Sequence, residues 1–298
     1  MLQPQSRALL LVPVLGLLWG FNWPAVRIAL MEIAPWTLRS AGMSFAGLFL
    51  LLAALSSRQS LYVARAQWPR LVFSGILSVA AFNVLLAFAQ LMGATSRIAI
   101  LTFTMPIWAT LLAWLWLDEP LDRRKLLGLA LGSAGLAVLG LPLLAAGGLS
   151  AGLGLALIAS VSWALGTIVT KRWPVAAPAL TVAAWQLLIG GLVAGCGMLI
   201  FEGAPVLKTL QPRTWTALAF HIVLAQAAGY FIWFSVIARL PAGLASIGTL
   251  MVPAVGVIGS VALLGERPAL SDWFGLMLVL LASATIMIPK KTRIFLSD

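Results

Sequence analysis

Six neutral polar side chains lie within long apolar stretches of the sequence, where an unpaired amide or hydroxyl is costly. They are Asn22, Asn83, Gln90, Gln186, Gln226 and Tyr230. Amides and phenols can hold a solute by hydrogen bonding. These residues are therefore candidate contacts of a bound solute. The alternative is a hydrogen-bond network between helices that holds no ligand.

Helical spacing sorts some of these side chains onto shared faces. Asn83 and Gln90 follow the i, i+7 spacing of one helix face, and Gln226, Tyr230 and Trp233 follow a similar spacing in a later stretch. We therefore expect two polar stripes that meet across a cavity.

Tryptophan is abundant, at 13 residues. Several lie near the ends of apolar stretches, as membrane-interface aromatic residues do. Four lie deeper: Trp19, Trp163, Trp185 and Trp233. Indoles in the wall of a cavity would stack against planar apolar side chains of a solute, which favours aromatic or large apolar amino acids. Packing within the protein or against lipid is the alternative role.

Two Thr and Pro pairs share the same spacing, Thr102 with Pro106 and Thr249 with Pro253. Proline lacks the N–H that would bond the carbonyl four residues earlier, so each pair frees one threonine carbonyl. Lipid cannot satisfy that carbonyl, and we expect both threonines to line a central binding site. The alternative is a kinked helix whose threonine hydroxyl bonds back within its own helix.

The charged residues restrict the solute further. None of the eight acidic residues lies in the middle of an apolar stretch, which disfavours a cationic solute. Arg39 and Arg97 lie near the ends of apolar stretches, and we expect their side chains to reach the membrane surface. With no deep basic residue, an anionic solute is also disfavoured. The sequence thus predicts a neutral or zwitterionic solute.

Three further residues could carry a function but favour structural roles. His221, the one histidine, could relay protons, yet a hydrogen-bonded structural imidazole is the favoured interpretation. Glu119 and Glu266 are expected to fix loops by interacting with helix N-termini. Cys196 is the single cysteine and cannot form an internal disulfide or a multi-cysteine metal site.

Composition identifies an integral membrane protein, because 62% of the residues are hydrophobic, 9% are charged and the mean hydropathy is +1.05. We expect an all-α chain of ten membrane-spanning helices in the cell inner (plasma) membrane. They cover residues 8–30, 36–55, 71–92, 95–117, 126–143, 151–170, 179–201, 213–238, 242–264 and 272–289. We expect no cofactor, metal site or nucleic-acid partner, and a monomer is compatible with the sequence.

The sequence repeats itself. Pro106, Glu119 and Gly128 recur at one constant offset as Pro253, Glu266 and Gly275. The repeat predicts two units, residues 1–146 and 147–298, each with five helices. An odd number of spans inverts the second unit relative to the first. Basic residues concentrate on one side of the predicted spans, which places both termini in the cytoplasm.

The chain resembles the drug/metabolite transporter superfamily in its ten-helix EamA-type branch. The resemblance covers essentially the whole chain and rests on Leu17–Trp23, on Pro106 to Pro120 and on Pro253 to Pro268. Size, helix count and tryptophan content also resemble the bacterial aromatic amino-acid exporters called YddG. The resemblance implies a bundle in which helices one to four and six to nine surround a cavity, and it implies export.

These observations predict a secondary transporter that exports aromatic and bulky neutral amino acids by alternating access around a midplane cavity. The predicted bending points are Gly20, Pro106, Gly166, Gly229 and Pro253. Alternatives are a carrier of drugs or other metabolites, a channel, or a membrane scaffold. An enzyme is disfavoured, because the sequence contains no paired intramembrane aspartates, no HExxH site and no nucleophile elbow.

Overall fold

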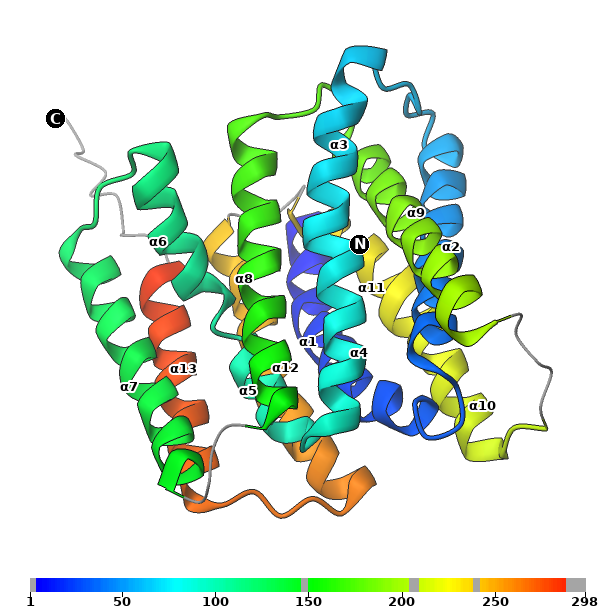
Figure 1. Cartoon of the computed structure of the whole chain (residues 1–298). Coiled ribbons are helices and arrows are strands. Elements are labelled where there is room, and N and C mark those ends of the chain that lie inside the picture. The colour runs from blue at the N-terminus through cyan, green and yellow to red at the C-terminus, as the bar shows by residue number, and fades with distance from the viewer. Residues whose placement is uncertain (1–3, 146–149, 204–208, 238–241, 288–298) are drawn as a thin grey trace, which may run out of the picture.

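The computed structural model describes residues 4–145, 150–203, 209–237 and 242–287, which form ten helical rods (Figure 1). The first five rods are α1 (Pro4–Ala29), α2 (Pro35–Ser56), α3, η2 and α4 (Trp68–Gly75, Ile76–Ala81, Phe82–Met92), α5 and α6 (Thr95–Thr102, Met105–Leu117) and α7 (Arg123–Ala145), with a short 3₁₀ turn, η1 (Arg65–Gln67), before the third. The other five are α8 (Ala151–Arg172), α9 and η3 (Ala179–Gly197, Met198–Glu202), α10, η4 and α11 (Pro212–Ala219, Phe220–Ala228, Gly229–Ile237), α12 (Ala242–Leu264) and α13 (Leu270–Met287).

Eight of the described helical segments are long and apolar enough to cross a membrane, and two shorter apolar helices, Met251–Leu264 and Leu270–Ile286, complete the ten. The predicted all-α, ten-helix membrane fold is therefore confirmed, and the chain is a multi-pass membrane protein. The predicted boundary between the two units, at residues 146 and 147, lies outside the described residues.

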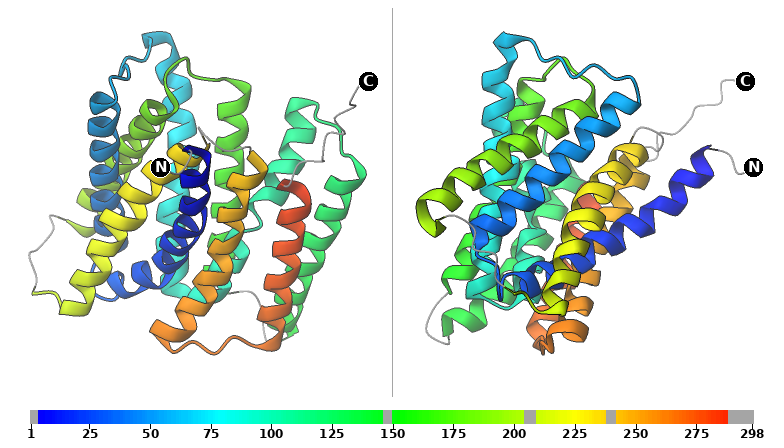
Figure 2. Two further views of the ribbon diagram at one scale, coloured as in Figure 1. Left: turned by 180° about the vertical axis from the view of Figure 1, so that it is seen from behind. Right: turned by 90° about the vertical axis from the view of Figure 1, so that its right-hand side faces the viewer.

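Pairs of rods from the two halves of the chain pack along each other. Helix α1 packs against α12, α2 against α9, and α7 against α13. Figure 2 shows α1, α11 and α12 on one side and α2, α3 and α9 on the other, close together at one end and diverging toward the other. The diverging end carries the connections 57–67, 118–122 and 173–178 (Figure 1), and the basic residues predict that it is the cytoplasmic face.

Glycines related by the repeat occupy equivalent places in the α7–α13 contact. A Cβ added at Gly128 would lie 2.5 Å from Ile286, and one added at Gly275 would lie 2.5 Å from Leu139. Each glycine thus lets its helix approach a large side chain of the other, at opposite ends of the pair. The two helices therefore exchange roles across one contact, as the predicted inverted repeat leads us to expect.

Carboxylates anchor the starts of two helices at the face opposite the predicted cytoplasmic one. Glu202 accepts hydrogen bonds from the backbone N–H groups of Trp36 and Thr37, both at 2.8 Å, at the start of α2. Glu266 accepts from the N–H groups of Thr95 at 2.6 Å and Ser96 at 2.9 Å, at the start of α5. A carboxylate is favourable there because helix N-termini carry unpaired donors and partial positive charge.

The predicted role of Glu266 in fixing a helix N-terminus is thus confirmed, although the helix is α5 rather than the one that follows Glu266 in the chain. Its repeat partner Glu119 behaves differently. Glu119 forms ion pairs with Lys125, at 3.2 Å, and with Lys171. The hydrogen bond from Lys171 is the main reason that the pKa of the Glu119 carboxyl lies below its ordinary value. This residue fixes the 118–122 connection through lysines, not through helix N–H groups.

The two repeat prolines have different consequences. At Pro106 the rod is interrupted, because α5 ends at Thr102 and α6 begins at Met105. Pro253 lies inside the continuous helix α12.

The predicted bending glycines are tightly packed. An added Cβ would lie 2.4 Å from Val255 at Gly20, 2.6 Å from Ser78 at Gly166 and 2.5 Å from Trp19 at Gly229. Bending at these five positions stays a prediction.

Candidate functional site

A buried arginine lies between α2 and α4. Arg39 is 3% exposed, and its Nη1 donates to Oδ1 of Asn83 at 3.3 Å. Asn83 is held in turn by its own donation to the carbonyl of Val79 at 2.9 Å. The expectation that Arg39 reaches the membrane surface was therefore wrong. Its side chain turns into the bundle because the face of α2 that carries it packs against α4 and η4.

The single histidine borders the same region. His221 is fully buried in the π-helical segment η4, and its Nδ1 lies 2.8 Å from Oδ1 of Asn22 on α1. Gly42, one turn after Arg39 on α2, packs against the imidazole, since an added Cβ would lie 2.7 Å from Nε2. Both the imidazole of His221 and the phenol of Tyr230 on α11 lie within Coulombic range of the Arg39 guanidinium. We refer to Asn22, Arg39, Asn83, His221 and Tyr230 as the Arg39 cluster.

Several buried polar atoms of the cluster and its surroundings lack a hydrogen-bond partner among the described residues. They are Nε of Arg39, Nε2 of His221, Oε1 of Gln90 and Oε1 of Gln226. Such atoms are expensive in a protein interior unless water or a ligand satisfies them. The ion pairs seen within the described ranges use other cations, among them Arg97, Lys125 and Lys171, and none uses Arg39. Among the described residues the guanidinium is thus a buried cation without a carboxylate partner.

Three aromatic side chains form a wall next to the cluster. The ring of Trp19 lies 5.8 Å from the ring of Tyr230 and 5.8 Å from that of Trp233, measured between centroids. The indole N–H of Trp19 donates to the carbonyl of Ala225 at 3.0 Å, which orients the ring. Tyr230 belongs to both sets, so the wall of Trp19, Tyr230 and Trp233 adjoins the Arg39 cluster. An apolar, flat surface and a buried cation therefore lie side by side.

The predicted polar stripes are partly brought together. Asn83 lies in the Arg39 cluster, and Gln90, further along α4, is buried without a partner for Oε1. Tyr230 and Trp233 share the face of α11 that meets Trp19. Gln226 precedes them in η4, where i to i+5 hydrogen bonding changes the helical register. The α-helical spacing used for that stripe therefore does not hold over its whole length.

The broken rod at Pro106 satisfies its freed carbonyl within the protein. The carbonyl of Thr102 accepts from Oγ of Ser160 on α8 at 2.8 Å, while the Thr102 hydroxyl donates back to Ile98 at 2.7 Å. Thr104 lies 3.2 Å from the same serine oxygen. This contact is the packed arrangement that the sequence left open as the alternative for Thr102. Pro253 lies in α12, but the side chain of Thr249 lies outside the described part of the chain.

Three further predicted residues lie away from the Arg39 cluster. Trp185 donates to the carbonyl of Leu61 at 3.1 Å and packs against Trp68, with ring centroids 5.2 Å apart. Gln186 donates to Oγ of Ser74 at 2.9 Å. These contacts join α9 to α3 and to the 57–67 connection. The third residue, Trp163, is half-buried on α8.

Arg39 is the residue that sequence reasoning missed, because its distance from the start of α2 suggested a surface position. Gly42 offered a signal, since it lies one turn away and leaves room beside the arginine for a side chain from another helix. No group of three or more His, Cys, Asp or Glu side chains that could hold a metal ion occurs among the described residues. The arrangement places a buried guanidinium beside an apolar, aromatic surface.

Comparisons with known proteins agree with a transporter. The sequence model of the EamA-like transporter family matches residues 6–141 and 150–288. The "Uncharacterized transporter YvbV" of Bacillus subtilis is 27% identical over 290 residues, which cover 97% of this chain and 94% of that protein. The "Probable amino-acid metabolite efflux pump" of Salmonella typhimurium is 28% identical over 275 residues, covering 87% and 86%. One solved crystal structure shares the fold, with a TM-score of 0.66 at 19% identity over 94% of this chain and 95% of that chain.

Proposed function

Because the chain belongs to the EamA-like transporter family, we propose that it exports zwitterionic amino acids with aromatic or bulky apolar side chains. The protein is a membrane transporter and not an enzyme. Transport proceeds by alternating access: the units 1–146 and 147–298 rock against each other around the bound solute. Export is the direction that the name of the Salmonella relative suggests.

The observation that carries this proposal is the buried guanidinium of Arg39 without a carboxylate partner among the described residues. An arginine fork forms paired, charge-assisted hydrogen bonds with a carboxylate. A substrate carboxylate would complete the hydrogen bonding of Nε, which is unpartnered and buried. The α-carboxylate is common to all amino acids, so Arg39 supplies recognition of the class.

Specificity for the side chain follows from the neighbouring wall. Trp19, Tyr230 and Trp233 offer aromatic faces at which a planar or bulky apolar group gains contact area. The amides of Asn22, Asn83, Gln90 and Gln186, and Trp163, Trp185 and Thr249, remain predicted contacts of the same solute along its path. The hydroxyl and carbonyl of Thr102 are already bonded within the protein, so Thr102 would need to change partners to contact the solute. Among the described residues, neither the Arg39 cluster nor the aromatic wall contains a carboxylate, and Glu202, Glu266 and Asp272 are engaged elsewhere, so a solute that carries only positive charge would meet no counterion at this site.

A competition experiment in proteoliposomes tests the proposal. Vesicles are loaded with unlabelled phenylalanine, uptake of labelled phenylalanine is followed by counterflow, and four competitors are compared. Phenylalanine is expected to compete, whereas phenylalaninamide without a carboxylate and alanine without a ring are not. Phenylpropionate, which lacks the ammonium group, is expected to compete weakly. Equal competition by phenylalaninamide and phenylalanine would contradict carboxylate recognition, and absence of any exchange would favour another metabolite or a channel.

A further inference from the structure

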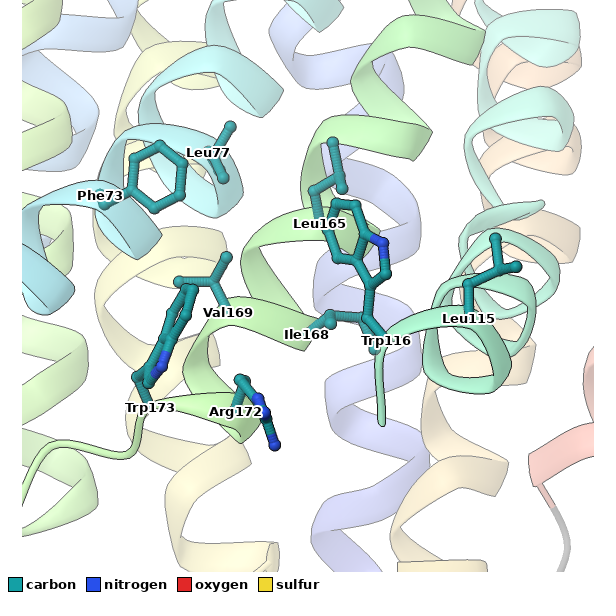
Figure 3. A pocket seen from close by; sticks show the side chains of 9 residues that line it. All are labelled: Phe73, Leu77, Leu115, Trp116, Leu165, Ile168, Val169, Arg172 and Trp173. Carbon is teal, nitrogen blue, oxygen red and sulfur yellow. The ribbon is translucent and has the colours of Figure 1, made fainter. Parts of the chain in front are cut away.

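We propose that a groove between α3, α6 and α8 on the outer surface of the bundle binds one acyl chain of an anionic phospholipid, whose phosphate contacts Arg172. The groove has a volume of about 600 Å³. This volume lies within the range of roughly 300–1,000 Å³ found for ligand pockets. Its lining is apolar except at one end: Phe73, Leu77, Leu115, Trp116, Leu165, Ile168, Val169, Arg172 and Trp173 (Figure 3).

The groove is open at its sides and closed at its floor. Phe73 of α3 is 51% exposed and Trp116 of α6 is 54% exposed, whereas Ile168 of α8 is 3% exposed. Figure 3 shows Phe73 and Leu115 on opposite sides, with side chains of α8 between them. In a membrane such a furrow faces lipid, and an acyl chain is the apolar, elongated group available to fill it.

The groove is separate from the proposed solute site. Arg172 and Trp163 are nine residues apart on α8, which is two and a half helical turns and places them on opposite faces. The face of α8 that carries Trp163 also carries Ala156 and Ala159. Both alanines are fully buried, so this face packs against the interior of the bundle. The lipid proposal therefore stands or falls independently of the transported solute.

Charge at the open end selects the headgroup. Arg172 and Trp173 end α8 at the predicted cytoplasmic face, where an arginine and a tryptophan lie at headgroup level. Among the described residues no acidic side chain pairs with Arg172, although the adjacent Lys171 is held by Glu119. Arg70 lies one turn from Phe73 on α3 and adds a second exposed cation on that side. Arg172 at the end of the groove, with Arg70 one turn from Phe73, complements a lipid phosphate.

A smaller pocket provides an internal comparison. It has a volume of about 170 Å³ and lies between α5, α7 and α8, with Arg97 among its lining residues. There the guanidinium is engaged, because Nε of Arg97 lies 2.7 Å from Oδ1 of Asp272. The smaller pocket thus has less room for an acyl chain than the groove, and the charge of its arginine is already paired with a carboxylate. The larger groove is the one that offers a free charge to a headgroup.

Native mass spectrometry of the full chain, released from detergent with added dioleoyl phosphatidylglycerol or dioleoyl phosphatidylcholine, tests the proposal. One phosphatidylglycerol is expected to be retained in preference to phosphatidylcholine. Arg172→Gln should weaken retention about fivefold, the effect of one basic residue near an anionic lipid. Leu165→Trp, which fills the groove without changing charge, should weaken it as well. Arg58→Gln removes an exposed cation from another connection and should leave retention unchanged.

Three results would overturn the proposal: equal retention of the two lipids, unchanged retention in both Arg172→Gln and Leu165→Trp, or an equal loss in Arg58→Gln. Inorganic phosphate serves as a competitor. Displacement of the lipid by phosphate alone would show that the arginines bind a free anion and that the apolar groove contributes nothing. Melting temperatures of the variants identify any change that unfolds the protein.

Discussion

Nδ1 of His221 lies 2.8 Å from Oδ1 of Asn22, and this contact joins η4 to α1 in the interior of the bundle. The other ring nitrogen, Nε2, is buried beside Gly42 without a partner among the described residues. The favoured interpretation of the histidine as a hydrogen-bonded structural group agrees with this contact. A proton relay would require an aqueous path to a fully buried ring.

Removal of the asparagine should destabilise the protein. Asn22→Ala leaves Nδ1 of His221 buried and unpaired, at a cost of roughly 1–3 kcal/mol. The loss is measured as a lower melting temperature in detergent. Thr216→Ala is the control, since its exposed hydroxyl bonds only the carbonyl of Pro212 in its own helix. Equal melting temperatures of Asn22→Ala and the parent protein would contradict the assigned role.

The aromatic wall should be sensitive to the size of residue 229. A Cβ at Gly229 would lie 2.5 Å from Nε1 of Trp19, so Gly229→Ala should displace the indole and lower exchange of aromatic amino acids. Gly154→Ala is a matched control, because an added Cβ there meets no atom within 4 Å. The control should keep exchange and gain up to about 1 kcal/mol of stability from its higher helix propensity. Equal exchange by both variants would argue against a role for Trp19.

Glu266 should hold the N-terminus of α5 against the 265–269 connection. Glu266→Gln replaces the carboxylate that accepts from Thr95 and Ser96, and the clamp should weaken. A cysteine introduced at Ser96, with Cys196 replaced by alanine, should then react faster with a membrane-impermeant thiol reagent. Arg267→Gln, an exposed neighbour, serves as the control. An unchanged rate of labelling in Glu266→Gln would show that the Glu266 carboxylate does not limit access of the reagent to position 96.

The ion pairs of Glu119 should contribute stability that depends on pH. Its carboxyl has a folded-state pKa below the ordinary value of 4.5, chiefly because Lys171 donates to it. The stabilisation is therefore complete above the ordinary pKa and is lost as pH falls through the lower, folded-state value. The difference in melting temperature between the parent protein and Glu119→Gln should shrink from about pH 7 to about pH 3. A difference that grows on acidification would contradict the assignment.

The helical rods could be predicted because each needs only a long apolar run between short polar connections. The interruptions could not, since η2 and η4 have the same apolar composition as the α-helices around them. The change to i to i+5 bonding in η4 then shifts the direction of Gln226 relative to Tyr230. A face assigned from α-helical spacing cannot detect this change.

The residues of the candidate site could be predicted by type more readily than by position. Trp19, Asn22, Asn83, Tyr230 and Trp233 stood out as polar or aromatic groups in apolar runs, and the structure brings them into one region. Arg39 could not be assigned, because its burial depends on the packing of α2 against η4, a contact between distant parts of the sequence. A position near a helix end is compatible with either direction of a long side chain.

Counterflow of labelled phenylalanine by Arg39→Gln is the most direct test of carboxylate recognition by the Arg39 cluster. The parent protein, Arg39→Lys and Arg267→Gln are measured beside it, and melting temperatures establish that each variant is folded. Arg39→Gln should lose exchange by tenfold or more, the effect of about 1.4 kcal/mol. Arg39→Lys should retain part of it, and Arg267→Gln should match the parent. Full exchange by a folded Arg39→Gln protein would contradict the account.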